Sequence, residues 1–364
     1  MPIVYSLILI TFLVCLGITP ITIKLAHKFN LVDMPDNNRR IHQKPMPRVG
    51  GIAIVISMLI GFLIYYLITK NIESIAFNKM FLGYLIGSII IASMGFIDDI
   101  VNLRARHKFL FQLLAAIIVY LFGIKIVGIK IPFIYSDIIN FGFLDFPITL
   151  FWIVGITNAV NLIDGLDGLA AGISAISATA LLIIFITTSA SLEAIIIAAV
   201  LVGATLGFLP YNFNPAKTFM GDVGSNFLGF TLAILSILGF AKGYTMLAIV
   251  APIFALGVPI FDTLFAMVRR FLKGVPMLKP DGGHIHHRLI KMGLTQKQAV
   301  FVLYIVTSIL CLIAVVIVSA DVWKFILLVL ALLCFIAIGI VGMKKYKSNV
   351  ENKINQKSQD KCEK

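Results

Sequence analysis

Charged residues are scarce in this sequence. Of its 364 residues only 13% are Asp, Glu, Lys or Arg, whereas 60% are hydrophobic, and the mean hydropathy is +1.02. That balance excludes a soluble globular protein of this length, because soluble domains contain a larger fraction of charged residues and a smaller fraction of apolar ones. Most of the chain must therefore lie in lipid.

Cysteine is scarce too, with four residues in the whole sequence. Cys15, Cys311 and Cys334 lie inside apolar runs, and Cys362 lies close to the last residue. No pair has the spacing of metal ligands, so neither a disulfide framework nor a cysteine-based zinc site is supported. The sequence also lacks a polar stretch long enough for a soluble second domain.

Long uncharged runs dominate what is present. A hydrocarbon core of roughly 30 Å needs about 20 apolar residues per helix, and about eleven runs meet that length. They fall near residues 3–23, 50–69, 81–97, 109–128, 147–162, 169–188, 192–210, 226–240, 246–268, 299–319 and 323–343. We therefore expect an all-α integral membrane protein, a polytopic bundle of about 10–11 transmembrane helices that forms a single membrane-embedded domain over residues 1–343.

The basic residues give the expected orientation. The formal charge of +13 could suggest nucleic acid, but Lys and Arg gather in alternate connections between the runs. By the positive-inside rule those connections are cytoplasmic, which places the N-terminus outside and argues against a nucleic-acid partner. The first run has no basic stretch before it and no small-residue cleavage site after it, so an uncleaved span is expected rather than a signal peptide.

Two further segments follow from this orientation. The stretch 129–146 is rich in β-branched and aromatic residues and predicts a small extracellular β-hairpin. The Lys-rich tail, residues 344–364, returns to the cytoplasm. There it either lies against anionic headgroups or stays disordered in solvent.

Ionised groups are expensive in lipid, so polar residues near the ends of apolar runs need an explanation. Five such places occur, all on the predicted cytoplasmic side. The first is the basic loop 33–51, where Arg39, Arg40, Lys44 and Arg48 either hold phosphates or supply ordinary positive-inside charge. The second is the adjacent pair Asp98 and Asp99. Their repulsion is relieved by a divalent cation such as Mg²⁺, by a proton, or by basic neighbours in the following loop.

The third place reads NAVNLIDGLDGLAAG, residues 158–172. Asn158, Asn161 and Asp164 are spaced by three residues, so on a helix they project to one side, and Asp167 continues the series. Amide and carboxylate oxygens on one stripe resemble a ligand set for a hard cation. The stripe therefore predicts a site for a hard cation, with a purely structural loop as the alternative.

The fourth place reads FMGDVGSNFLG and the fifth KPDGGHIHHR. Asp222 lies at the start of a span, where helix amides and a neighbouring metal could share a phosphate. Phe219 either stacks on a base or is a membrane-interface aromatic. The fifth place supplies imidazoles and a guanidinium for phosphates or sugar hydroxyls, from His284, His286, His287 and Arg288. Zinc would need further ligands, and an exposed polar loop is the alternative.

In this order and on one membrane face, these motifs resemble the polyprenyl-phosphate N-acetylhexosamine-1-phosphate transferase family of integral membrane enzymes, over nearly the whole chain. The DGGHIHHRLIKMG segment is similar to the bacterial branch that uses UDP-N-acetylglucosamine to start O-antigen, common-antigen or wall teichoic acid synthesis. The peptidoglycan branch usually has three consecutive histidines. Here Ile285 interrupts the run, which leaves the phospho-N-acetylmuramoyl-pentapeptide transferase as the alternative.

The resemblance implies transfer of a sugar phosphate from a UDP-sugar to undecaprenyl phosphate in the cytoplasmic membrane, with release of UMP. It implies Mg²⁺, with Mn²⁺ as a substitute, held by Asn161 and Asp222 with Asp164 and Asp167 close by. The Asp98–Asp99 pair would either join the metal site or contact the acceptor phosphate as a base. Direct attack by the lipid phosphate is favoured over a covalent aspartyl intermediate.

The remaining motif residues would bind substrate. Lys44 and Phe219 would hold the uridine and its phosphates, the His and Arg residues the sugar or pyrophosphate, and Asn158 would join them. A homodimer is compatible with the sequence, although no interface is specified. The rival class is a transporter or cation channel, but its sites lie near the bilayer midplane and often show repeats, which this sequence lacks.

Overall fold

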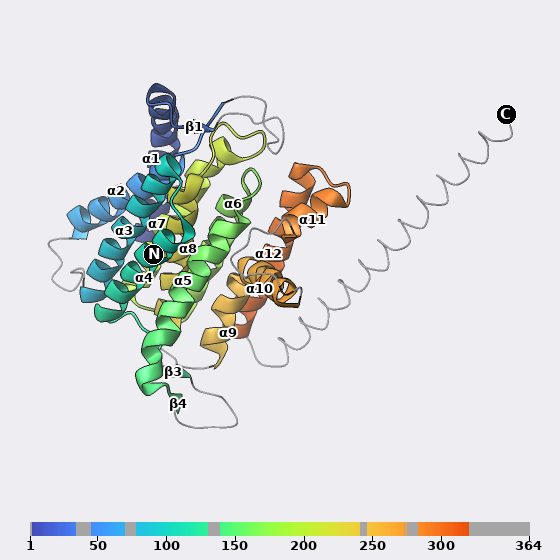
Figure 1. The fold of residues 1–364 in the computed structure, drawn as a ribbon. Helices are drawn as coiled ribbons and strands as arrows, with labels where there is room; N and C mark the ends of the chain where they lie inside the picture. Colours follow the sequence, from blue (N-terminus) through green and yellow to red (C-terminus); the bar gives the residue numbers. More distant parts are fainter. Residues whose placement is uncertain are drawn as a thin grey trace, which may run out of the picture. The chain divides into compact units, whose positions relative to one another are not determined.

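The computed structural model describes residues 2–33, 45–69, 78–129, 139–240, 246–272, 274 and 283–319. Most of them are helical (Figure 1). The helices are α1 (Pro2–Lys28), α2 (Gly51–Thr69), α3 (Lys79–Val101), α4 (Ala105–Leu121), α5 (Asp145–Ile163), α6 (Leu169–Thr187), α7 (Leu192–Asn212), α8 (Gly221–Phe240), α9 (Met246–Ala255), α10 (Gly257–Leu272), α11 (Ile285–Lys291), α12 (Gln296–Ser319) and the 3₁₀ turn η2 (Gly142–Leu144).

Two short strand pairs accompany the helices and lie at opposite ends of the bundle (Figure 1). The strand β1 (Val32–Asp33) pairs antiparallel with β2 (Met46–Pro47), and β3 (Gly128–Ile129) pairs antiparallel with β4 (Ile139–Asn140). The second pair falls where the hairpin is predicted, but residues 130–138 lie outside the described part. That this strand pair lies outside the cell stays a prediction.

Within the described residues, eight helices are long and apolar enough to cross a membrane, namely α1, α2, α3, α5 with η2, α6, α7, α8 and α12. They match eight of the predicted runs, which makes the chain a multi-pass, all-α membrane protein. The run near 109–128 is represented by α4, which has 17 residues. The predicted span 323–343 and the tail 344–364 lie outside the described residues.

The predicted continuous span 246–268 is wrong in the structure, because the segment divides into α9 and α10. Pro259 lacks an amide hydrogen, so the helical bond to the carbonyl of Ala255 is missing, and that carbonyl accepts from Ser177 Oγ at 2.6 Å. Beyond the break α10 is amphipathic: Phe265 and Val268 are exposed, whereas Asp262 and Ala266 are buried. A buried acid thus lies inside what the sequence presents as an apolar run.

Glycines let the helices approach closely at two places in the bundle. Gly203 and Gly207 are one turn apart on α7, and a side chain at either would collide with backbone carbonyls of α1. A side chain at Gly95 on α3 would similarly meet the backbone of Val223 on α8. Such small residues favour close packing of membrane helices. The second contact brings the C-terminal end of α3 against the N-terminal end of α8.

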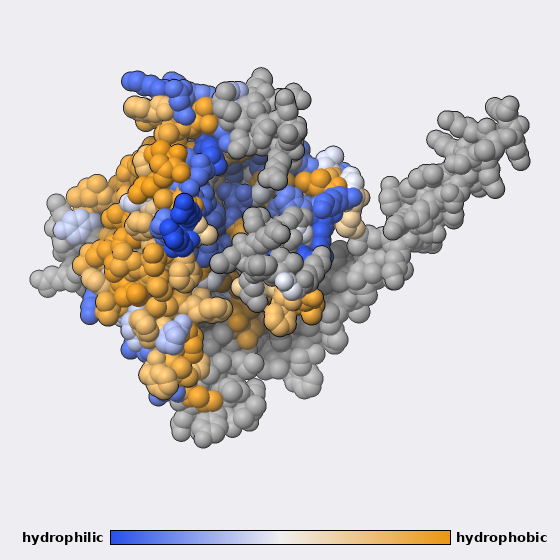
Figure 2. Space-filling view, in the orientation of Figure 1, coloured by the Kyte–Doolittle hydropathy of each residue, from blue (hydrophilic) through white to orange (hydrophobic). Residues whose placement is uncertain are grey.

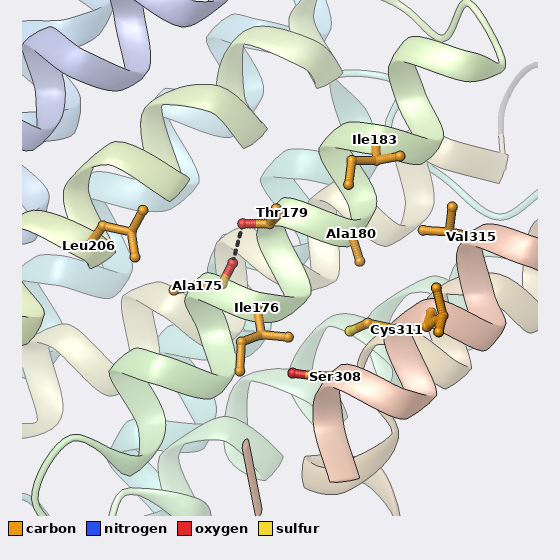
Figure 3. A pocket seen from close by; sticks show the side chains of 10 residues that line it. Ala175, Ile176, Thr179, Ala180, Ile183, Leu206, Ser308, Cys311 and Val315 are labelled. Carbon is orange, nitrogen blue, oxygen red and sulfur yellow. Dashed lines mark hydrogen bonds between the residues drawn. The ribbon is translucent and has the colours of Figure 1, made fainter. Parts of the chain in front are cut away.

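The surface separates into apolar and polar regions. In Figure 2 apolar residues cover the flank formed by α2, α3 and α4, and hydrophilic residues gather towards the centre of the view. An apolar pocket of about 360 Å³ lies between α6, α7 and α12 (Figure 3), with Ile176, Leu206, Cys311 and Leu312 among its lining residues. None of the predicted site residues lines it, so the candidate active site has to be sought among the polar side chains.

Candidate active site

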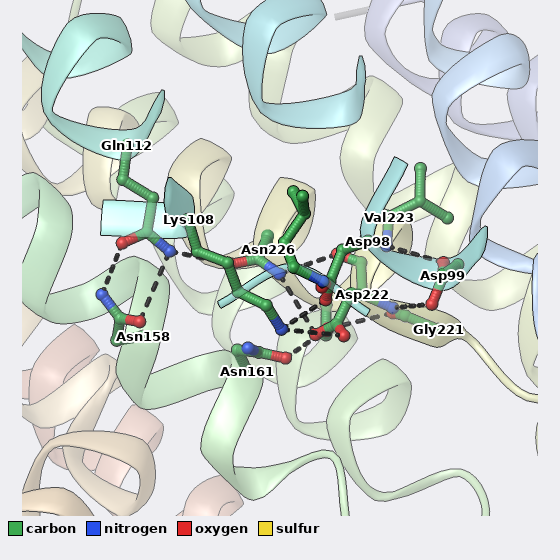
Figure 4. Close-up of polar contacts among 12 residues, drawn as sticks. Asp98, Asp99, Lys108, Gln112, Asn158, Asn161, Gly221, Asp222, Val223 and Asn226 are labelled. Carbon is green, nitrogen blue, oxygen red and sulfur yellow. Dashed lines mark hydrogen bonds and ion pairs between the residues drawn. The ribbon is translucent and has the colours of Figure 1, made fainter. Parts of the chain in front are cut away.

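Helix ends from α3, α4, α5 and α8 meet around a group of polar side chains (Figure 4). We call it the acidic cluster, and it consists of Asp98, Asp99, Lys108, Asn161, Asp164 and Asp222. Lys108 Nζ forms an ion pair with Asp98 Oδ2 and a second one, at 3.2 Å, with Asp222 Oδ2. The amide of Leu103 donates to Asp98 Oδ1 at 2.6 Å. One ammonium group therefore joins two carboxylates that are far apart in the sequence.

The two adjacent aspartates have different surroundings. Asp99 accepts hydrogen bonds from the amides of Asp222 at 2.8 Å and Val223 at 3.1 Å. Its carboxylate thus satisfies amides that the first turn of α8 leaves without helical partners. Gly221, the first residue of α8, has φ +69°, and a side chain there would collide with the Asp99 carboxylate. Asp98 faces Lys108, whereas both oxygens of Asp99 are engaged by α8.

A network of amides and a hydroxyl fixes the register of α4, α5 and α8. Ser225 Oγ donates to Asn161 Oδ1 at 2.8 Å, and Asn226 Nδ2 donates to the backbone carbonyl of Asp222 at 2.8 Å. Gln112 Nε2 donates to Asn226 Oδ1 at 3.0 Å, while Asn158 Nδ2 donates to Gln112 Oε1 at 2.7 Å. Asn158 therefore reaches the cluster through Gln112 and Asn226.

Asp164 lies at the C-terminal end of α5 and is the least engaged acid of the cluster. No described residue gives its carboxylate a hydrogen bond or an ion pair. Burial, together with the charges of Asp222, Asp99 and Asp167, raises the pKa of Asp164 to about 8. Negative charge is thus in excess around this carboxylate, which favours a positively charged ligand.

The cluster fits a hard divalent cation. Asp164 and Asp222 offer carboxylate oxygens and Asn161 an amide oxygen, and Mg²⁺ in phosphoryl-transfer sites usually takes one or two carboxylates together with waters and substrate phosphates. Among the residues that the structure describes, no group of three His, Cys, Asp or Glu side chains could hold a metal ion. The donor set therefore suits a cation shared with a substrate better than a closed protein cage.

Asp167 anchors the loop that precedes α8. Its Oδ2 accepts from Asn214 Nδ2 at 2.8 Å and from the amide of Ala216 at 3.2 Å. Tyr304 of α12 donates to the carbonyl of Gly168, so the loop between α5 and α6 is held from a second side. Asp167 lies beside the acidic cluster, with one oxygen committed to this anchoring.

Phe219 lies in the same loop, half-buried. Its amide donates to the carbonyl of Pro47 at 2.8 Å, and its carbonyl accepts from the amide of Gly50 at 3.1 Å. These bonds join the loop to the beginning of α2. Lys44, together with Arg39 and Arg40, lies outside the described residues.

The second region is the histidine segment, residues 283–288. Its first histidine, His284, is buried and places Nδ1 2.9 Å from Asp262 Oδ2. The ring of His286 lies parallel to that of His284 at a centroid distance of 5.8 Å. Its Nε2 edge touches Gly165, where any side chain would collide with the ring. The histidine segment therefore contacts the loop that carries Asp164 and Asp167.

His286 is only 2% exposed, and its Nδ1 has no hydrogen-bond partner among the described residues. Burial, with smaller effects from His287 and His284, lowers the pKa of His286 to about 4. The ring is thus neutral near pH 7, and an unbonded buried nitrogen costs free energy until a ligand satisfies it. His287 and Arg288 are exposed, and Arg288 Nε donates to the carbonyl of Gly283 at 3.0 Å.

Comparison with known proteins identifies the family. Residues 81–240 match glycosyl transferase family 4. A protein of Bacillus subtilis (strain 168), named "Probable undecaprenyl-phosphate N-acetylglucosaminyl 1-phosphate transferase", is 42% identical over 341 residues, which cover 92% of each chain. The chain belongs to glycosyl transferase family 4. The resemblance seen in the motifs is thereby confirmed, and the family match, which runs from α3 to α8, contains the whole acidic cluster.

Two further relatives of this glycosyl transferase family 4 chain have different names. The "Decaprenyl-phosphate N-acetylglucosaminephosphotransferase" of Mycobacterium leprae (strain TN) is 32% identical, over 77% of this chain and 75% of its own length. The "Phospho-N-acetylmuramoyl-pentapeptide-transferase" of Clostridioides difficile (strain 630) is also 32% identical, over 85% and 95%. The higher identity of the Bacillus protein, over a larger share of this chain, favours the acetylglucosaminyl branch.

Several residues of the site were missed in the sequence. Lys108 and Gln112 are four residues apart on α4, and Ser225 and Asn226 follow Asp222 on α8. Residues spaced by three or four on a helix share a face, so this spacing was the available signal. Asp262 gave the weaker signal of a single acid inside an apolar run.

Proposed function

We propose that the chain transfers N-acetylglucosamine 1-phosphate from UDP-N-acetylglucosamine to undecaprenyl phosphate. The products are undecaprenyl-pyrophosphoryl-N-acetylglucosamine and UMP. The observation that carries the proposal is the contact between His286 and Gly165, because it puts the histidine segment beside the acidic cluster in a family 4 transferase. The names of the Bacillus and mycobacterial relatives support the donor sugar and a polyprenyl-phosphate acceptor.

The reaction would take place at the cytoplasmic face of the cell membrane, with the N-terminus outside. Lys and Arg gather in every second connection between the apolar runs, which supports this orientation. The product would be the first lipid-linked intermediate of an envelope polysaccharide such as teichoic acid, O-antigen or common antigen.

Asn161 and Asp222, with Asp164 nearby, would hold Mg²⁺, for which Mn²⁺ could substitute. A bound divalent cation neutralises charge on the donor pyrophosphate and polarises its phosphoryl oxygens. Ser225 orients the amide oxygen of Asn161 through its 2.8 Å hydrogen bond. Asp99 positions Asp222 by holding the first turn of α8.

Phosphoryl transfer depends chiefly on positioning and on stabilising negative charge. An oxygen of the lipid phosphate would attack the phosphorus that carries the sugar, forming the new P–O bond as the bond to UMP breaks. Lys108 would stabilise the two anionic substrates, and Asp98 beside it would orient the acceptor or act as its base. The lipid phosphate is already anionic near neutral pH, so we favour direct attack over an aspartyl intermediate.

The other predicted residues would bind the donor. His284, His286, His287 and Arg288 would contact its sugar or pyrophosphate, and Phe219 and Lys44 its uridine and phosphates. Asn158 would act through Gln112 and Asp167 through the loop that it anchors. Neutral His286 offers an unbonded nitrogen to a polar group of the donor.

One alternative donor has specific support. The Clostridioides difficile relative is named for the pentapeptide-bearing muramoyl donor and aligns over 95% of its own length. The same cluster could serve that donor, because the transferred phosphate and the acceptor would have the same chemistry. The transporter alternative loses its support with the family assignment.

The test uses purified full-length protein in detergent with undecaprenyl phosphate, Mg²⁺ and UDP-N-acetylglucosamine, and follows UMP release. We expect UMP to depend on both lipid and metal, and to disappear with EDTA. Turnover only with UDP-N-acetylmuramoyl-pentapeptide would move the chain to the other branch. Folded protein that releases no UMP from any UDP-sugar would refute the proposed transferase activity.

A further inference from the structure

Asp262 has no role in the reaction proposed above, yet it is a buried carboxylate on α10 with 3% of its surface exposed. Its Oδ2 lies 2.9 Å from His284 Nδ1, and its Oδ1 accepts the amide of Ile285 at 2.8 Å. Ile285 is the first residue of α11. Burying a carboxylate is costly unless its partners are well arranged, and both partners here belong to the histidine segment.

The contact with the carboxylate selects one form of the His284 ring. An ionised carboxylate can only accept hydrogen bonds, so the hydrogen of a neutral imidazole must lie on Nδ1. The other nitrogen, Nε2, then carries a lone pair and acts as an acceptor. No described residue forms a hydrogen bond with Nε2, which leaves it available to a ligand.

The same carboxylate fixes where the segment begins. By accepting the Ile285 amide it satisfies one of the unbonded amides in the first turn of α11. His286 lies in that turn, parallel to His284, and its far edge rests on Gly165. Contacts thus run without a break from Asp262 to the loop of the acidic cluster.

We propose that Asp262 is the positioning residue of the histidine segment. It holds His284 as the tautomer whose Nε2 accepts a hydrogen bond from a hydroxyl or amide N–H of the nucleotide-sugar donor, and it fixes the start of α11. The inference rests on the proposed function, since it assigns the donor as the ligand. The acceptor lipid has no part in it.

The tautomer can be observed directly with histidine labelled by ¹⁵N in the full-length protein, without substrate. In the wild type we expect His284 as the Nδ1–H tautomer, identified by the signals that are lost in His284→Gln. In Asp262→Asn the side-chain oxygen can still accept the amide of Ile285, but the side-chain NH₂ group then faces the His284 ring. Because that group donates, Nδ1 has to accept, and the His284 tautomer should change to Nε2–H. A wild-type Nε2–H ring, or unchanged signals in the variant, would overturn the proposal.

Kinetics test whether Asp262 acts through His284. We expect Asp262→Asn to lower kcat/KM for UDP-N-acetylglucosamine by about 10- to 100-fold, as loss of an orienting partner typically does. The effect should appear in KM for the donor and leave KM for undecaprenyl phosphate unchanged. In the His284→Gln background the same change should cost nothing more, because two residues acting as one unit are not additive. Additive losses, or equal effects on both substrates, would contradict the inference.

Asp145 provides a matched control. It is another buried carboxylate at the end of a helix, accepting from Tyr120 at 2.7 Å and paired with Lys125 at 3.4 Å, and it touches neither region of the site. Asp145→Asn should keep the wild-type KM for both substrates. If the wild type itself releases no UMP, the proposed function fails, whereas the tautomer experiment still decides the role of Asp262.

Discussion

The acidic cluster and the histidine segment position their side chains in different ways. The cluster is built from the ends of four helices that are cross-linked by side chains, with Lys108 joining Asp98 to Asp222 and Asp99 bonded to the start of α8. The histidine segment is one short stretch of chain. Within the described residues it is held by Asp262, by Arg269, whose Nη1 donates to the carbonyl of Gly283, and by the contact of His286 with Gly165.

The difference shows how each region should respond to change. The charges of the cluster lie close together, so removing one carboxylate alters the electrostatics of the others. In the histidine segment the rings are aligned by contact, so an effect is passed from one residue to the next. We therefore expect large losses of activity from charge changes in the cluster, and smaller, donor-specific effects from the histidine segment.

The largest effect is expected for Asp222→Asn. The change keeps the size of the side chain but removes the carboxylate that both faces Lys108 and is proposed to bind the metal. Turnover should fall by at least about 1000-fold, measured as UMP release by protein that unfolds cooperatively in detergent. Asp145→Asn is the control with near-normal rate. Residual activity within tenfold of wild type would remove Asp222 from the metal role.

The adjacent aspartates should separate activity from stability. Asp98→Asn leaves Lys108 with one carboxylate and should lower kcat by about 100-fold. Asp99→Asn keeps only one acceptor oxygen for two amides of α8, so it should lower the free energy of unfolding by about 1–2 kcal/mol and lower kcat less than Asp98→Asn does. Measuring UMP release and unfolding in detergent for both variants checks whether activity depends chiefly on Asp98 and stability chiefly on Asp99. The reverse pattern would show that Asp99 faces the substrates.

A change at the junction tests whether the two regions work together. Gly165→Ala places a methyl group against the ring of His286, which has to move, and the expected loss in kcat/KM for the UDP-sugar is on the order of 10-fold. Gly155→Ala on α5 is the matched control, because no atom lies within 4 Å of the position of its new methyl group. Equal activities of the two variants would separate the histidine segment from the acidic cluster.

Much of the fold follows from the sequence because lipid imposes a simple rule on length and polarity. Long apolar runs predict helices that span the membrane, and eight of them are found among the described residues. The positions of Asp98, Asn161, Asp222 and the histidines could also be found, since polar residues at helix ends stand out against apolar runs. Their placement in one site required only that the connections alternate between two faces.

The roles of individual residues could not be derived in the same way. Successive residues on a helix point about 100° apart, so sequence gives no means of deciding which of Asp98 and Asp99 faces α8. Lys108 looks like any other positive charge of a basic connection until Asp222, 114 residues later, is brought beside it. Asp262 lies in an apolar run, and its spacing does not identify His284, 22 residues later, as its partner.

The smallest effect concerns pH and the buried ring of His286. Its pKa of about 4 in the folded protein lies below the value of about 6.5 expected in the unfolded chain. The neutral ring therefore contributes stability that is complete above pH 6.5 and is lost as the pH falls towards 4. Between pH 6.5 and 5.5 the wild type should lose about 1 kcal/mol more of its free energy of unfolding than His286→Gln.

Unfolding by SDS at both pH values measures this difference between the two proteins. The contributions of all other titrating groups cancel, because both proteins contain them. Parallel losses would mean that His286 already titrates normally, and that the histidine segment is open to water rather than closed against Gly165.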